Sequence, residues 1–156
     1  MNGKKLKIYF CASVIGGQEL VYLAKNIVDE LKSMGHFVLT EHVAKKGTLE
    51  IEKKRLGKDI AKIVFNRDLS WLKNDADMIV AEVSTPSLGV GYELSYFLEV
   101  VKKPVLCLYH RDHKKKVSFF ILGNSNKNLK VIEYKNTKEI KTILETYFNN
   151  LLISIK

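Results

Sequence analysis

The chain has 156 residues, 46% of them hydrophobic, and it contains only two prolines. That length suits one domain with a full hydrophobic core, and the composition is that of a globular protein. No apolar run approaches the roughly 20 residues that a membrane-spanning helix requires. The formal net charge is +9, but almost all the basic residues are lysines scattered along the chain, which is not typical of a nucleic-acid interface. We therefore predict a single domain, residues 1–156, with neither membrane nor nucleic acid as a partner.

Both cysteines, Cys11 and Cys107, lie inside apolar runs that have the character of strands. Buried, reduced thiols fit that position better than a disulfide, and this indicates a reducing, intracellular setting. The first residues lead directly into a short strand pattern, without the longer apolar stretch of a signal peptide. No cysteine–histidine cluster has zinc spacing. The prediction is a cytoplasmic protein, or also a nuclear one in a eukaryotic cell, without a metal site.

Strand and helix patterns alternate along the chain. The expected strands cover residues 7–12, 37–40, 77–83, 104–109 and 129–134. The expected helices cover residues 16–34, 51–72 with a break near Asn66, 92–101, 117–122 and 138–153. Gly35 is a stop signal for the first helix, and Pro104 stands at a strand start, where no ladder donor is lost. This order predicts an α/β fold with a five-stranded parallel sheet covered on both faces.

Ligands of such folds bind beyond the carboxyl ends of the strands. Four groups of residues follow predicted strands and should meet at that edge. They are Ser13 with Ile15, Gly16 and Gly17, then Glu41 with His42, then residues 84–93, and finally residues 110–118.

The most informative of these segments is residues 83–93, VSTPSLGVGYE. A small, hydroxyl- and glycine-rich turn between a strand and a helix presents backbone N–H groups and a helix N-terminus to an anion. Glu93 is expected in the first turn of the helix, where a carboxylate is favoured. An anion cradle beside a carboxylate suggests a phosphorylated small molecule and chemistry next to its phosphate.

A second turn of small residues, 12–17, follows the first strand. It lacks the glycine spacing of the dinucleotide fingerprint and the lysine of a P-loop. Two interpretations are equally good for it alone: a second phosphate or sugar contact, or a tight turn that requires glycine.

Three further side chains are candidates for chemistry. Asp68 follows Arg67 on an amphipathic helix, a pattern that usually indicates a surface ion pair. Cleavage of a glycosidic-type bond, however, commonly uses two carboxylates, and Asp68 is a candidate for the second one beside Glu93. His42, at a strand end, suits either proton transfer to a leaving base or a bond to the backbone. Tyr9 alternates with Ile8 and Phe10 in a buried strand, so its ring is expected in the core and its hydroxyl needs a partner.

Six segments together resemble one family, the 2'-deoxynucleoside 5'-phosphate N-hydrolases, which belong to the wider nucleoside 2-deoxyribosyltransferase superfamily. The segments are YFCAS (9–13), LTEHV (39–43), DLSWL (68–72), AEV (81–83), PSLGVGYEL (86–94) and LCL (106–108). The PSLGVGYE motif is specific, and the order of the segments holds over nearly the whole chain.

The resemblance implies a flavodoxin-like three-layer fold, a homodimer without cofactor or metal, and hydrolysis of a deoxynucleoside 5'-monophosphate to base and deoxyribose 5-phosphate. Glu93 matches the nucleophile, Asp68 the second carboxylate and Tyr9 a tyrosine beside the nucleophile. The positions that match contacts around the sugar and phosphate are Ser13, Ile15, Gly16, Gly17, Ser87 and Gly89. Ser118 matches a serine that reaches the phosphate from the neighbouring subunit, and His42 lies in the segment near the base.

The chain departs from the family pattern at three places. Ile15 and Gln18 stand where arginines are usual, an extra residue separates Asp68 from the third strand, and the loop 111–116 is more basic. The resemblance leaves the base open between a modified pyrimidine such as that of 5-hydroxymethyl-dUMP and a CMP-type ribonucleotide. Base transfer by a deoxyribosyltransferase, a nucleotide sensor without turnover and, last, a nucleic-acid-binding module are the alternatives.

Overall fold

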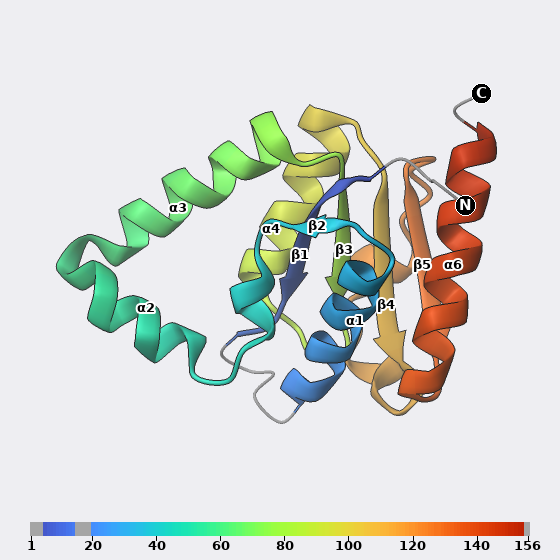
Figure 1. The fold of residues 1–156 in the computed structure, drawn as a ribbon, viewed down its shortest axis with the longest axis horizontal. Helices are drawn as coiled ribbons and strands as arrows, with labels where there is room; N and C mark the ends of the chain where they lie inside the picture. The colour runs from blue at the N-terminus through green and yellow to red at the C-terminus, as the bar shows by residue number, and fades with distance from the viewer. Residues whose placement is uncertain (1–4, 15–19, 155–156) are drawn as a thin grey trace.

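The computed structural model describes residues 5–14 and 20–154. These residues form one five-stranded parallel sheet in the order β2-β1-β3-β4-β5 (Figure 1), the flavodoxin-like order of a doubly wound fold. The predicted parallel α/β architecture is thereby confirmed. The strands are β1 (Lys7–Ala12), β2 (Phe37–Val38), β3 (Met78–Glu82), β4 (Val105–His110) and β5 (Leu129–Tyr134).

Helices cover both faces of the sheet. Helix α1 (Val21–Ser33) and helix α6 (Thr137–Ser154) lie on one face, and helix α4 (Leu88–Tyr96) lies on the other (Figure 1). The remaining helices are α2 (Thr48–Leu56), α3 (Ile60–Ser70) and the short α5 (Phe119–Leu122). Within the described residues, none of the helices combines the length and apolar character that crossing a membrane would require.

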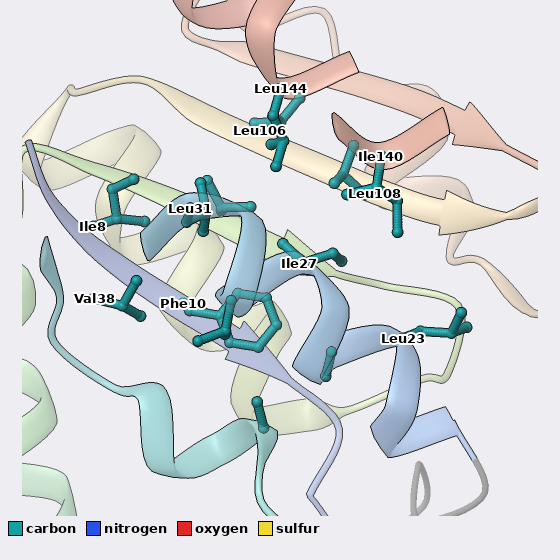
Figure 2. Close-up of a cluster of buried hydrophobic side chains, with 14 of the residues drawn as sticks. Ile8, Phe10, Leu23, Ile27, Leu31, Val38, Leu106, Leu108, Ile140 and Leu144 are labelled. Carbon is teal, nitrogen blue, oxygen red and sulfur yellow. The ribbon is translucent and has the colours of Figure 1, made fainter. Parts of the chain in front are cut away.

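Successive residues of β1 serve different layers, because side chains of a strand alternate between its faces. Ile8 and Phe10 pack against α1 in the cluster that Figure 2 shows, which extends across the sheet to α6. Tyr9 and Cys11 face the opposite layer, where α4 lies. A residue of β1 that points toward α4 can therefore meet a side chain of that helix.

The second strand is shorter than predicted and ends at Val38. The Thr40 hydroxyl accepts a hydrogen bond from the Phe10 N–H at 2.8 Å and donates to the Phe10 carbonyl at 2.5 Å. The buried Thr40 side chain thus bonds to the backbone groups of Phe10 that a longer strand β2 would have paired with. A 3₁₀ turn, Glu41–Ala44, follows directly. His42 is consequently on a turn at the end of β2.

The long amphipathic stretch breaks at Gly57 and not near Asn66. Gly57 has φ +65°, which glycine adopts without the cost that a side chain would impose, and it separates α2 from α3. The two helices extend away from the sheet as an arm (Figure 1). A π turn, Trp71–Asp75, then leads from α3 to β3. A π turn contains one more residue per turn than an α-helix.

Helix α4 begins four residues earlier than predicted. Ser87 is its N-cap, and the Ser87 hydroxyl accepts a hydrogen bond from the Val90 N–H at 3.4 Å. Glu93 therefore lies in the second helical turn, and the expectation of a first-turn position was wrong. The small residues of the motif lie within the helix, at its N-terminal end.

Candidate active site

A pocket of about 570 Å³ opens at the carboxyl ends of β1 and β3. Its walls come from β1 and the residues after it, the turn after β2, the α2–α3 arm, and the beginning of α4. Among its lining residues are the predicted Tyr9, Ser13, His42, Asp68, Ser87, Gly89 and Glu93. The predicted convergence of strand-end segments at one edge of the sheet is thus confirmed for Ser13, His42, Ser87, Gly89 and Glu93.

Glu93 is at the centre of the hydrogen bonding in this pocket. The Tyr9 hydroxyl donates to its Oε1 at 2.7 Å, and the Cys11 thiol lines the same pocket and helps to lower the pKa of the carboxyl. Burial raises the pKa of Glu93 to about 7, and the negative charge of Asp68 adds to this rise, whereas Tyr9 and Cys11 oppose it. Glu93 can therefore exist in ionised or protonated form near neutral pH.

Tyr9 acts as a donor because its own ionisation is suppressed. Its side chain is 2% exposed, and burial, followed by the charge of Glu93, raises the pKa of the phenol far above the ordinary value. Burial likewise raises the pKa of the Cys11 thiol well above its usual range. Both groups keep their protons, so they favour the ionised form of the Glu93 carboxyl.

Asp68 is half-buried and is held by its neighbour in the chain. The Arg67 Nε donates to Asp68 Oδ1 at 2.8 Å, and the two side chains are 20% and 19% exposed. The ion pair predicted from the local pattern exists, but it lines the pocket and is not a solvated surface pair. The pocket thereby brings together two carboxyl groups, Asp68 and Glu93, of which one is paired with a cation.

His42 lies on the same side of the pocket as Arg67. Its Nε2 is 3.4 Å from Arg67 Nη2, and its ring centroid is 6.3 Å from that of Trp71. Burial lowers the pKa of the imidazole, and the charge of Arg67 lowers it further. His42 is therefore neutral at physiological pH, so it does not begin the reaction as an imidazolium acid.

The N-terminal end of α4 borders the pocket with little side-chain bulk. A Cβ on Gly89 would come within 4 Å only of the Ser87 hydroxyl, at 3.9 Å. A Cβ on Gly91, which lines a neighbouring pocket, would have no described atom within 4 Å. Protein packing therefore does not require glycine at these positions. The space beside the helix is left open for a ligand.

A buried polar network supports the loop before α4. Glu82, the last residue of β3, accepts hydrogen bonds from the Ser84 hydroxyl and from the Tyr134 hydroxyl, the latter at 3.1 Å. Ser84 Oγ in turn accepts from the His110 N–H at 2.7 Å. Burial raises the pKa of Glu82. The network joins the ends of β3, β4 and β5, and so fixes the base of the loop that leads to Ser87.

Three predicted groups lie apart from these contacts. Ser118 is exposed and lines a neighbouring pocket of about 570 Å³, which shares Ser87 with the first one. Glu41 forms ion pairs with Lys32 and Lys45 and does not line the pocket. Ile15, Gly16 and Gly17 lie outside the described residues.

Among the side chains of the pocket that sequence reasoning missed are Cys11, Glu52 and Arg67. Cys11 was considered only as a buried thiol, although its position two residues after Tyr9 places both on one face of β1. Arg67 was considered only as the surface partner of Asp68. Glu52 gave no signal, because its partner Arg67 is 15 residues away on another helix.

Comparison with known proteins agrees with the motifs. The model of the nucleoside 2-deoxyribosyltransferase family matches residues 8–140. A Nematostella vectensis relative, named provisionally as a 2'-deoxynucleoside 5'-phosphate N-hydrolase, is 46% identical over 93% of this chain and 95% of its own length. The 5-hydroxymethyl-dUMP N-hydrolase of Danio rerio is 40% identical over 94% of this chain and 98% of its own length.

A solved structure resembles the fold at lower identity. The CMP N-glycosidase of Clostridium botulinum superposes with a TM-score of 0.62 and 17% identity, over 89% of this chain and 98% of that chain. At this identity the likeness concerns the fold alone. On the extent of the family match and the identity to its relatives, the chain belongs to the nucleoside 2-deoxyribosyltransferase family.

Proposed function

We propose that this protein is an N-glycosidase that hydrolyses nucleoside 5'-monophosphates to free base and the sugar 5-phosphate. The observation that carries the proposal is the Tyr9–Glu93 hydrogen bond in a pocket that also contains Asp68 and the N-terminal end of α4. A carboxylate supported by proton donors suits attack on a sugar carbon, and a helix N-terminus suits a phosphate.

In the proposed first step, ionised Glu93 attacks C1' of the sugar. The C1'–N bond breaks, its electron pair leaves with the base nitrogen, and the base takes up a proton. Water then attacks C1' of the glycosyl-enzyme, loses a proton, and releases Glu93 and the sugar phosphate. Asp68 orients the sugar and assists proton transfer, and Tyr9 stabilises the carboxylate while it is ionised.

The phosphate end of the substrate is proposed to lie against the beginning of α4. Ser87 and Gly89 belong to that helix end, and Ser13 lines the same pocket from the end of β1. Free N–H groups of a first helical turn and the helix dipole favour an anion there. Ile15, Gly16 and Gly17 are proposed to contact the sugar or the phosphate, as the family resemblance implies.

The protein is further proposed to act as a homodimer in which Ser118 reaches the phosphate of the other subunit. Three large apolar side chains around the second pocket are almost fully exposed: Leu88 is 97% exposed, Phe119 88% and Phe120 92%. Such a cluster is typical of a protein–protein interface. Ser118 lines the second pocket, and Ser87 borders both pockets. A second copy that packs on this face by two-fold symmetry would therefore bring the Ser118 of each subunit toward the phosphate site of the other.

The proposed base is a pyrimidine, with a 5-hydroxymethyl group as first choice, because relatives from fish and mammals carry the name 5-hydroxymethyl-dUMP N-hydrolase. His42 is proposed to lie near this base. The proposed compartment is the cytoplasm.

The test is base release from 5-hydroxymethyl-dUMP, dUMP, dCMP, CMP and purine monophosphates, each beside its dephosphorylated nucleoside, by wild type and Glu93→Gln. We expect release from monophosphates only, and none by Glu93→Gln. An added acceptor base that becomes a new nucleoside would identify a transferase. If nucleotides bind but are not turned over, the hypothesis of a nucleotide sensor would replace that of an enzyme.

A further inference from the structure

Each of the three nitrogen atoms of the Arg67 guanidinium contacts another side chain, and one face of the group lies near an aromatic ring. Its Nε donates to Asp68 Oδ1 at 2.8 Å, its Nη1 donates to Glu52 Oε2 at 2.7 Å, and its Nη2 lies 3.4 Å from His42 Nε2. The guanidinium carbon lies 5.0 Å from the centroid of the Trp71 ring. One side chain of α3 thus contacts α2, the turn after β2 and the π turn.

The contact with His42 determines where the imidazole carries its proton. Arginine is a donor only, so Nε2 of His42 must accept and must be unprotonated. The proton of the neutral ring is then on Nδ1. Burial and the charges of Arg67 and Arg55 lower the pKa of His42, whereas Glu52 and Asp68 raise it. The geometry and the charges therefore agree on a neutral ring with one defined tautomer.

The contact with Asp68 restricts the second carboxylate of the pocket. Arg67 Nε donates to Asp68 Oδ1. At the other end of the guanidinium, Nη1 donates to Glu52, and this second bond fixes the orientation of the guanidinium. Glu52 is 13% exposed and also accepts from Arg55 Nη2 at 2.8 Å. A lysine could replace the charge of Arg67 but not its planar set of donors, which satisfies three groups in three directions.

We propose that Arg67 is a positioning residue that orients the Asp68 carboxylate and holds His42 as the Nδ1–H tautomer. The inference rests on the proposed function, because only that function brings Asp68 and His42 to a substrate. It also narrows the role of His42: the imidazole serves the base as an Nδ1–H donor, and Nε2 is not a route for protons.

An ion-pair cluster that merely fastened the α2–α3 arm would not determine the protonation of His42. The first readout is therefore the ¹⁵N spectrum of the His42 ring in the free protein, assigned with His42→Asn and followed over pH. We expect the Nδ1–H tautomer in wild type. Arg67→Gln should give a mixture of tautomers and a higher His42 pKa. Arg67→Lys should also give a mixture of His42 tautomers, because lysine lacks the planar set of donors of the guanidinium.

Arg55→Gln is the matched control for the tautomer, because it removes the other ion pair of Glu52. The charge of Arg55 also lowers the His42 pKa, so the tautomer, and not the pKa, distinguishes this control from the Arg67 variants. Arg55→Gln should leave the His42 tautomer unchanged. If Arg67→Gln does not fold, Arg67→Lys and Glu52→Gln carry the test. An unchanged His42 tautomer in folded Arg67 variants would overturn the inference.

The second readout is the kinetics of base release. Arg67→Lys and Arg67→Gln should lower kcat at least tenfold and leave KM for the monophosphate within about twofold, because the phosphate contacts are elsewhere. Wild-type kcat in a folded Arg67→Gln protein would contradict the positioning of Asp68. If wild type turns over no nucleotide while the His42 spectrum changes as expected, the proposed function fails and the control of His42 by Arg67 stands.

Discussion

The Tyr9 hydroxyl and the Glu93 carboxylate are 84 positions apart in the chain and 2.7 Å apart in the fold. Tyr9 comes from β1 and points to the face of the sheet that α4 covers. Glu93 comes from the second turn of that helix. The contact exists because β1 and β3 are neighbours in the sheet and α4 follows β3 directly.

Removing the Tyr9 hydroxyl should move the pH dependence of the reaction. Its hydrogen bond lowers the pKa of Glu93, which burial has raised to about 7. Tyr9→Phe should therefore raise this pKa further and displace the acidic limb of kcat/KM to higher pH. Activity should fall more at pH 6 than at pH 8.5. The control is Tyr109→Phe, which removes a hydroxyl that donates to Glu133 on the neighbouring strand β5. An acidic limb that does not move would contradict this assignment.

Replacing Glu93 by glutamine should stabilise the fold at high pH. The pKa of Glu93 is raised from 4.5 to about 7, so the folded state binds the proton more tightly than the unfolded state. This contribution is complete below pH 4.5 and is lost as pH rises to about 7. At pH 8, Glu93→Gln should be more stable than wild type by up to about 3 kcal/mol.

Urea denaturation at pH 4.5 and at pH 8 measures this difference, which should be close to zero at the lower pH. The exposed Glu50 on α2 supplies the control, Glu50→Gln, for which stability should change little at either pH. Equal stability of wild type and Glu93→Gln at pH 8 would mean that ionised Glu93 is not destabilised by burial.

A charge on the exposed apolar cluster should separate the proposed dimer. Phe120 is 92% exposed beside the second pocket, and Phe120→Asp would require burial of a carboxylate in the interface. Light scattering after size exclusion should find dimers for wild type and monomers for this variant. Phe37→Asp, on an exposed residue of β2, should remain dimeric. A monomeric wild type would refute the dimer.

Mixed dimers can show whether Ser118 acts across the interface. Ser118→Ala should raise KM for monophosphates, and Glu93→Gln should be inactive. If Ser118 serves the neighbour's pocket, a heterodimer of the two variants has one complete site, with Glu93 from one chain and Ser118 from the other. Mixing should then restore wild-type KM in part of the population. If Ser118→Ala raises KM but mixing restores nothing, Ser118 acts in the site of its own chain. An unchanged KM in Ser118→Ala would place it outside both sites.

The network at the end of β3 should contribute to stability. Tyr134→Phe removes a buried donor to Glu82, which then loses one of its hydrogen bonds without access to water. The expected loss is about 1–3 kcal/mol, measured by urea denaturation at neutral pH. Tyr109→Phe is again the matched comparison, since its partner Glu133 is partly exposed and can bind water. A loss no larger than that of Tyr109→Phe would show that the network contributes little.

The parts of the fold that could be predicted depend on short-range patterns. Alternation in residues 7–12 gave both the strand and the two faces on which Phe10 and Tyr9 lie. The strand-end rule then grouped Ser13, His42 and Ser87 at one edge. The family and the parallel fold were confirmed, whereas the chemical roles of the individual residues stay predictions.

What could not be predicted depends on contacts between distant residues. Thr40 ends β2 by binding the backbone of Phe10, 30 residues earlier, and no local pattern of residues 37–40 contains that partner. The break at Gly57 was missed because the amphipathic pattern continues on both sides of it. Arg67 was recognised as a partner of Asp68, but its bond to Glu52 depends on how α2 and α3 are placed relative to each other.

Ser87 and Glu93 are carried by the same helix, α4, at its cap and in its second turn. Six residues of α-helix rise by about 9 Å, and a helix changes its length little. The helix therefore keeps a fixed distance between the end where phosphate would bind and the carboxyl group that would attack the sugar. A one-residue insertion or deletion between them would rotate Glu93 away from Tyr9 by about 100°. We would accordingly expect the length of this segment to be less tolerant of change than the identity of its side chains.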